Sequence, residues 1–333
     1  MCKNAKSVGI MSHINPDGDG FCASLALSHI LHKHSIESRI VVDEPVFTKF
    51  DYLMSAIMDS SGKLPRENTI VGFRPEMRFD LLIILDCNSY SRLGDRATLL
   101  EYAQQVILLD HHESEGSTIS AGVSYIDTTH VSTGVILFQI FGDEIALFEP
   151  ADRKYIADCL YTTILNDTNN FSNANTNPES YEVSATLCAW GMKPKDMYDA
   201  FFQSFTPDEM RYLGNVLSTI ETLRDGRILF MHSSLDMLHR NNLETDNLQN
   251  TTRWVQGVKG LDAIIYAREE QPGSFRISLR SLKLNVNNIA ASFGGGGHKN
   301  ASGCGIMGTF SEVRQMILEA VSKSLDEFDA SLS

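Results

Sequence analysis

The sequence predicts an α/β protein in which a doubly wound, mainly parallel sheet is joined by a linker to a smaller α/β domain. Short apolar runs that end in an acidic residue, such as LLIILD and VILLD, alternate with segments of helical spacing, which is typical of buried parallel strands covered by helices. The 333 residues also exceed the usual size of one core. We expect a first domain at 1–189, a connector at 190–207 and a second domain at 208–333.

The first domain begins with an apolar run at 7–12, which predicts a strand, followed by a Pro/Gly/Asp turn and a helix at 21–34. Further runs at 38–43, 80–86 and 105–110 are too short and continuous for surface helices, so they predict more buried strands. Segments such as FDYLMSAIM and RATLLEYA can form crossover helices between these strands.

The second half of the chain changes character after a helical segment at 177–191. Three β-rich segments at 226–233, 261–269 and 274–281 precede the glycine run FGGGGHKNASGCG, and a final helix is expected at 310–328. This order predicts the smaller second domain.

Composition and charge limit the function classes. A formal net charge of −14 disfavours binding to extended duplex DNA, so any nucleic-acid substrate should be short or gripped locally. The sequence contains no window of about 18 uncharged apolar residues, so we expect no membrane-spanning helix. The 6 cysteines are scattered without a CxxC pair, which is typical of reduced core thiols and favours a cytoplasmic protein.

Carboxylates and imidazoles gather where apolar runs end, at positions that we interpret as strand ends. They are His13, Asp17, Asp19, Asp86, Asp110, His111, His112 and Asp167. Oxygen and imidazole ligands suit Mn²⁺ and tolerate Mg²⁺ or another divalent ion, and the lack of cysteine among them argues against structural zinc. Taken singly, NPDGD could be an acidic turn, and Asp86 or Asp167 a helix cap. Their recurrence favours a two-metal hydrolase.

These motifs carry a family resemblance. HINPDGD, Asp86, the DHH at 110–112 and NDTNNF resemble, in order, the four motifs of the DHH phosphoesterase superfamily, and GGGGHKNASG is similar to the DHHA1 signature. The likeness extends from Ser7 to about Gly305 and is greatest for the bacterial branch of oligoribonucleases and pAp phosphatases, the nanoRNases.

The resemblance implies a role for each residue of the first domain. His13 and Asp17 would bind one Mn²⁺; Asp19, His111 and Asp167 would bind the second; and Asp86 would bridge the two ions. It also implies that Asp110 orients a ligand histidine. His112 would contact the scissile phosphate or protonate the leaving oxygen.

The second domain is expected to select the substrate. Glycine backbone N–H groups can approach a phosphate closely, and Arg280 can grip one with two N–H groups. The expected binding residues are Arg280, Ser281, Gly295, Gly296, Gly297 and His298. Taken alone, the glycine run could be a flexible loop and Arg280 a solvated strand residue; their order as in DHHA1 domains favours binding.

The resemblance therefore implies a Mn²⁺-dependent phosphoesterase that hydrolyses short oligoribonucleotides such as pApA to mononucleotides, with pAp to AMP as a candidate second activity. A phosphodiesterase for cyclic di-AMP is an enzymatic alternative, and a nucleotide-binding sensor without turnover is the non-enzymatic one. A membrane or extended duplex DNA is not an expected partner. The oligomeric state is open, with a homodimer as one option.

Overall fold

The computed structural model describes residues 5, 7–44, 47–58, 62–74, 76–113, 118–202, 205–243 and 251–331. The chain divides into two compact units, Met1–Ser204 and Phe205–Ser333. The domain limits expected from the sequence stay a prediction, and residues 203 and 204 of the expected connector lie outside the described residues.

The N-terminal unit is built on a parallel sheet with the strand order β3-β2-β1-β4-β5-β6. The strands are β1 Val8–Met11, β2 Ser38–Val42, β3 Thr69–Val71, β4 Leu81–Leu85, β5 Gln105–Asp110 and β6 Val123–Ile126. Val8 of β1 pairs with Ser38 of β2 on one side and with Leu81 of β4 on the other. The strand order reverses between β1 and β4, and in such sheets ligands bind outside the carboxyl ends at that point.

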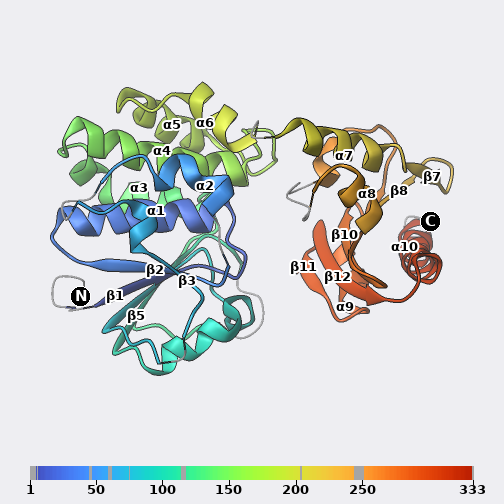
Figure 1. Cartoon of the computed structure of the whole chain (residues 1–333), viewed down its shortest axis with the longest axis horizontal. Helices are drawn as coiled ribbons and strands as arrows, with labels where there is room; N and C mark the ends of the chain where they lie inside the picture. The colour runs from blue at the N-terminus through green and yellow to red at the C-terminus, as the bar shows by residue number, and fades with distance from the viewer. Residues whose placement is uncertain are drawn as a thin grey trace. The chain divides into compact units, whose positions relative to one another are not determined.

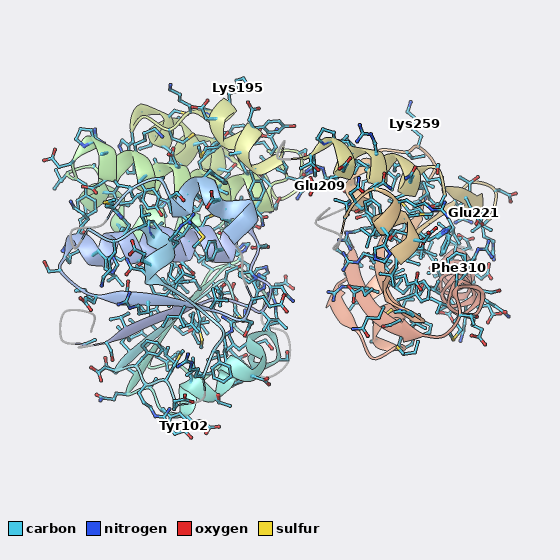
Figure 2. The ribbon with its side chains drawn as sticks, viewed as in Figure 1. Tyr102, Lys195, Glu209, Glu221, Lys259 and Phe310 are labelled. Atoms are coloured by element: carbon cyan, nitrogen blue, oxygen red, sulfur yellow. The ribbon has the colours of Figure 1, made fainter. Side chains whose placement is uncertain are left out.

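Helices cover both faces of this sheet. The α-helices are α1 Gly18–Lys33, α2 Phe47–Met54, α3 Thr133–Ile145, α4 Pro150–Asp167, α5 Pro178–Ala189 and α6 Pro194–Phe202. They lie on one face, and the 3₁₀ segment η3 Tyr90–Glu101 lies on the other (Figure 1). Figure 2 labels one residue on each side: Lys195 of α6, and Tyr102, which directly follows η3. The predicted doubly wound α/β class is confirmed.

Two details of the N-terminal unit differ from expectation. The apolar run before Asp167 is not a strand: it belongs to α4, which is buried from Tyr155 to Leu165. The segment at 96–103 was expected to form a crossover helix, but its residues up to Glu101 belong to the 3₁₀ segment η3, which kinks at Gly94 with φ 57°. A short apolar run fits a buried helix and a buried strand equally well, so the sequence did not separate them.

The C-terminal unit has a mixed sheet in the order β11-β12-β10-β9-β8-β7. Its strands are β7 Glu221–Leu223, β8 Ile228–Ser233, β9 Ala263–Gln271, β10 Ser274–Arg280, β11 Gly296–His298 and β12 Ala301–Met307. Its helices are α7 Pro207–Leu217, α8 Leu235–Arg240, the 3₁₀ turn η4 Thr251–Trp254, α9 Val286–Ala291 and α10 Phe310–Ser331. Only the β8–β9 pair among these strands is parallel.

Helix α10 buries one stripe of side chains on the core of the C-terminal unit. Val313, Ile317, Val321 and Leu325 recur every four residues and are all buried, which is the pattern of a helix with one apolar face. Phe310 at its start packs on the ring of His232 with centroids 4.3 Å apart. Phe310 and Glu221, whose carboxylate accepts a hydrogen bond from Arg314 of α10, are labelled in Figure 2.

The cysteines and the helices bear on the expected compartment. Cys22, Cys87, Cys159 and Cys304 are buried free thiols, but Cys188 is free and exposed, so the expectation of a core position is wrong for Cys188. Cys2 lies outside the described residues. Among the described helices, none is long and apolar enough to cross a membrane.

Candidate active site

The candidate site lies at the carboxyl edge of the parallel sheet, where the strand order reverses. His13 follows β1 after one residue, Asp86 follows β4 directly, and Asp110 is the last residue of β5. Because β1, β4 and β5 are neighbours in the sheet, their ends bring these three segments together.

The first group of possible metal ligands consists of His13, Asp17 and Asp86, with one ligand atom of each within 4.8 Å of the others. The Nε2 atom of His13 lies 3.7 Å from Asp17 Oδ1 and 3.4 Å from Asp86 Oδ2. Asp17 also caps α1, because its Oδ1 accepts hydrogen bonds from the backbone N–H groups of Asp19 and Gly20. The carboxylate of Asp17 therefore caps a helix and is also placed to bind a metal ion.

The second group consists of Asp19, His111 and Asp167, and a further combination of possible ligands joins His111 and Asp86 to His112. The Nε2 atom of His111 lies 3.1 Å from Asp167 Oδ2 and 3.5 Å from Asp19 Oδ2. It also lies 3.5 Å from Asp86 Oδ1. The two oxygens of Asp86 therefore face different groups, and this is the arrangement that the expected bridging role requires.

Several atoms of these groups have no hydrogen-bond partner although they are buried. They are His13 Nε2, Asp86 Oδ1, His111 Nε2 and Asp167 Oδ2. Leaving buried polar atoms without a partner is costly, so a native protein normally supplies one. A divalent cation in each group would give these four atoms a partner, and oxygen and imidazole donors are the ligands that hard or borderline ions prefer. The residues therefore fit a metal centre.

Asp167 reaches the cluster from a helix and not from a strand. It is the last residue of α4, which packs against α1 along the same face of the sheet. The expected strand end at Asp167 is wrong, but its expected position beside Asp19 and His111 agrees with the second group.

Asp19 is held by a second helix that the sequence analysis missed. Its fully buried carboxylate accepts hydrogen bonds from the backbone N–H groups of Thr133 at 2.7 Å and Gly134 at 3.1 Å, at the N-terminus of α3. The positive end of the helix dipole favours a negative charge there. Gly134 is required by space, because a Cβ would lie 2.0 Å from Thr163 Oγ1. The sequence signal was the Ser132-Thr133-Gly134 helix start.

Asp110 orients His112. Its Oδ1 accepts hydrogen bonds from the backbone N–H groups of His111 and His112 and lies 2.8 Å from His112 Nδ1. The contact fixes the ring of His112, while His111 is held by Asp110 only through its backbone. Burial lowers the pKa of His112, but the bonds to Asp110 and Asp86 outweigh it and raise the pKa to about 10.

The η3 segment supports the chain around His13 through residues that carried no sequence signal. The fully buried guanidinium of Arg96 donates to Val41 O at 2.8 Å and to Ser12 O at 2.9 Å, and Asp43 lies 3.0 Å away. On the other side of His13, the backbone N–H of Ile14 donates to the carbonyl of Arg92. The loop that carries His13 is thus fixed on both sides.

In the absence of metal, the histidines of the cluster hold protons strongly. Burial lowers the pKa of His13 and of His111, but the neighbouring carboxylates outweigh it and raise these values to about 10 and about 12. For Asp86, burial raises the pKa, yet the histidines around it lower it well below its usual range. At neutral pH the metal-free cluster therefore holds imidazolium groups around the Asp86 carboxylate, whereas burial raises the pKa of Asp19 and of Asp167.

This protonation predicts that metal binding releases protons. A histidine must lose its proton to become a ligand, so we expect at least about one proton released for each of His13 and His111, and metal affinity that rises between about pH 6 and 8. Any proton held by Asp19 or Asp167, whose pKa values burial raises, would add to this release. Isothermal titration calorimetry with Mn²⁺ in buffers of different ionisation enthalpy measures the protons released. Zero release, or affinity that falls as the pH rises, would contradict the assignment of these histidines as ligands.

The expected substrate-binding residues all belong to the C-terminal unit. Arg280 ends β10, is half-buried, and donates to the carbonyl of its neighbour Leu279; burial lowers its pKa. The Ser281 hydroxyl donates to Asp262 O and accepts from the N–H groups of Lys283 and Leu284, so it is engaged in a buried turn.

The glycine run is more ordered than the expected loop. Gly296 and Gly297 lie in β11, which pairs with β12, and Gly295 directly precedes it. A Cβ at Gly295 would lie 2.2 Å from Gly303 O, and Gly297 has φ 142°, so both positions need glycine. The backbone of His298 pairs with Ala301, while its side chain lies outside the described residues.

Comparisons with known proteins agree with this geometry. Residues 7–164 match the DHH family, N-terminal domain, and residues 230–327 match the DHHA1 domain. The chain is 30% identical to the bifunctional oligoribonuclease and PAP phosphatase NrnA of Thermus thermophilus over 319 residues, which cover 95% of this chain and 89% of the relative. The protein of the same name in Bacillus subtilis is 20% identical, with 88% and 87% covered.

Among solved structures, an exopolyphosphatase-related protein from Bacteroides fragilis superposes with a TM-score of 0.82. It is 24% identical, and the match covers 98% of this chain and 95% of that chain. This likeness shows the shared fold across both units. With both family domains matched in order and the relative from Thermus matched over nearly its whole length, the chain belongs to the DHH family of phosphoester hydrolases and carries a DHHA1 domain.

Proposed function

We propose that the protein is a phosphoesterase that uses two divalent ions, Mn²⁺ in the first place, to hydrolyse short oligoribonucleotides such as pApA to mononucleotides, and pAp to AMP. The observation that carries the proposal is Asp86, whose two oxygens face two separate groups of possible ligands. The relatives named as oligoribonuclease and PAP phosphatase support the choice of substrates.

The chain's own residues divide the work of hydrolysis. His13 and Asp17 would hold one ion, Asp19, His111 and Asp167 would hold the other, and Asp86 would contribute to both. Bound ions would supply a water nucleophile of lowered pKa and neutralise charge on the phosphate. His112, held at Nδ1 by Asp110, directs Nε2 as a proton donor to the leaving oxygen.

For the C-terminal unit we propose a substrate-binding role, with the catalytic domain at 1–189, the connector at 190–207 and the binding domain at 208–333. The guanidinium of Arg280 and the backbone of Gly295, Gly296 and Gly297 would bind phosphate, and His298 would contact the nucleotide. Ser281 would act through the turn that follows Arg280, because its hydroxyl is already bonded inside the unit.

A substrate comparison tests the proposed function. Purified protein in Mn²⁺ is offered pApA, longer RNA, pAp and cyclic di-AMP in parallel, and we expect kcat/KM for pApA to exceed that for longer RNA and cyclic di-AMP by at least about tenfold, or 1.4 kcal/mol. Preference for cyclic di-AMP would replace the proposal with a signalling phosphodiesterase. Saturable nucleotide binding without turnover of any substrate would favour a sensor.

A further inference from the structure

Asn166 links Asp167 to the turn at the start of α1. Its Oδ1 accepts a hydrogen bond from the backbone N–H of Gly18 at 3.2 Å, and its Nδ2 donates to Asp167 Oδ1 at 2.7 Å. The two ends of an amide side chain are easily confused, but a backbone N–H can only donate. The bond from Gly18 therefore fixes the orientation, and the amino group of Asn166 faces Asp167.

This bond makes the two oxygens of Asp167 unequal. Oδ1 is engaged by the amide of Asn166, whereas Oδ2 is buried, has no hydrogen-bond partner and lies 3.1 Å from His111 Nε2. A carboxylate that is free to rotate can offer a cation either one oxygen or both. With Oδ1 committed to Asn166, Oδ2 is the oxygen left for an ion.

The same amide ties together segments that lie far apart in the sequence. Gly18 stands between Asp17 and Asp19, which belong to different ligand groups. A Cβ at Gly18 would lie 2.8 Å from the Cβ of Asn166, so the two backbones approach as closely as glycine allows. Movement of Asn166 would thus affect Asp167 and the turn that carries Asp17 and Asp19.

Two more asparagines donate to Asp167, but to its backbone. Asn173 Nδ2 and Asn175 Nδ2 lie 2.9 and 3.2 Å from Asp167 O. Residues 169–171, which lie between Asp167 and these two asparagines, all have positive φ, so the chain turns back toward the carbonyl of Asp167. Such donors satisfy a carbonyl at the end of α4, where the helix dipole is negative. Of these three asparagines, Asn166 alone donates to the carboxylate, so Asn173 offers a matched control.

We propose that Asn166 is a positioning residue that commits Asp167 to single-oxygen coordination through Oδ2 and thereby sets the affinity of the ion held by Asp19, His111 and Asp167. The inference rests on the proposed two-ion function. Hydrogen bonds to metal-binding carboxylates commonly contribute 10- to 100-fold in metal affinity.

The test is Mn²⁺ binding by the metal-free, full-length protein. Calorimetry and electron paramagnetic resonance follow the two binding events in the wild type, in Asn166→Leu, which keeps the volume but removes both hydrogen bonds, and in Asn173→Leu. We expect Asn166→Leu to weaken one of the two affinities by about 10- to 100-fold. The other affinity in that variant, and both in Asn173→Leu, should stay within about twofold.

A second measurement addresses the oxygen directly. In a Mn²⁺-loaded crystal structure of the wild type, Asp167 should coordinate through Oδ2 alone while Oδ1 keeps its bond to Asn166. Thermal unfolding of the metal-free variants shows whether a loss of affinity reflects a loss of fold.

The outcomes separate this inference from the proposed function. Two Mn²⁺ ions bound by the wild type with unchanged affinities in Asn166→Leu, or coordination through Oδ1, would overturn the role of Asn166 alone. Equal weakening of both affinities with a lower unfolding temperature would replace it with a general structural role. If the wild type binds no Mn²⁺, the two-ion proposal and this inference both fail.

Discussion

Replacing Asp86 with asparagine should lower kcat/KM for pApA in Mn²⁺ by at least about 10³-fold, or about 4 kcal/mol. The side chain is 2% exposed, and its Oδ1 and Oδ2 lie 3.5 and 3.4 Å from the Nε2 atoms of His111 and His13. Asparagine keeps the shape but turns an NH₂ group toward one of the two ligand groups. The NH₂ group repels a cation at the position where the carboxylate oxygen would attract it, so one of the two ions should be lost. Calorimetry should count the ions bound, and steady-state kinetics the turnover.

Asp80 provides the matched control for this variant. It directly precedes β4, at the other end of the same strand, and is half-buried with a hydrogen bond from Gln104. Asp80→Asn should keep turnover and both ions within about twofold, because it removes a carboxylate from the same strand without touching the cluster. Unchanged hydrolysis by Asp86→Asn at controlled metal concentration would disprove the bridging role.

Replacing His112 with glutamine should lower kcat for pApA by about 10²- to 10⁴-fold, the usual contribution of a positioned general acid. Its Nδ1 is held by Asp110 at 2.8 Å, which leaves Nε2 to deliver the proton that the ribose oxygen needs as it leaves. A 4-nitrophenyl ester of a nucleotide has a leaving group that needs no proton. On that ester, the same variant should therefore lose less than about tenfold in kcat. The ratio of the two losses in kcat measures how much His112 contributes by donating a proton.

His130 is a suitable control for His112. It is also half-buried in the N-terminal unit, and its Nδ1 lies 2.8 Å from Glu179 Oε2, so it repeats the pairing of a histidine with a carboxylate outside the cluster. For His130→Gln, kcat on both substrates should stay within about twofold of the wild-type value. If His112→Gln instead lowers kcat equally on the two substrates, His112 contacts the scissile phosphate and does not donate the proton.

The strands that carry most of the site could be predicted because their sequence pattern is local. β1, β4 and β5 are short continuous apolar runs, and a polar ligand follows or ends each of them. The pattern failed at Asp167, because α4 is buried along most of its length and its apolar run lacks the alternation that marks a surface helix. The position of Asp167 in the cluster was nevertheless expected.

The residues that hold the site in position could not be predicted from the sequence, because they act through contacts between segments that are distant in the chain. Arg96 holds the backbone of Ser12, and the start of α3 holds Asp19, over separations of 84 and 114 residues. The Ser132-Thr133-Gly134 segment marks the start of a helix, but no local pattern shows that this helix holds Asp19 or that Arg96 holds Ser12. The glycine run was expected to be a loop, but its pairing with β12 depends on a partner strand that composition alone does not identify.

The long spacing of the ligands has a consequence for how the protein matures. The proposed ligands extend from His13 to Asp167, so the cluster brings together segments from most of the N-terminal unit. Contacts of such high sequence separation form late in folding, because closing the long loops costs entropy first. During synthesis, the second group cannot form until α4 has left the ribosome. An ion that binds only the finished cluster then stabilises the folded state by mass action, and acts as a late check that folding of this unit is complete.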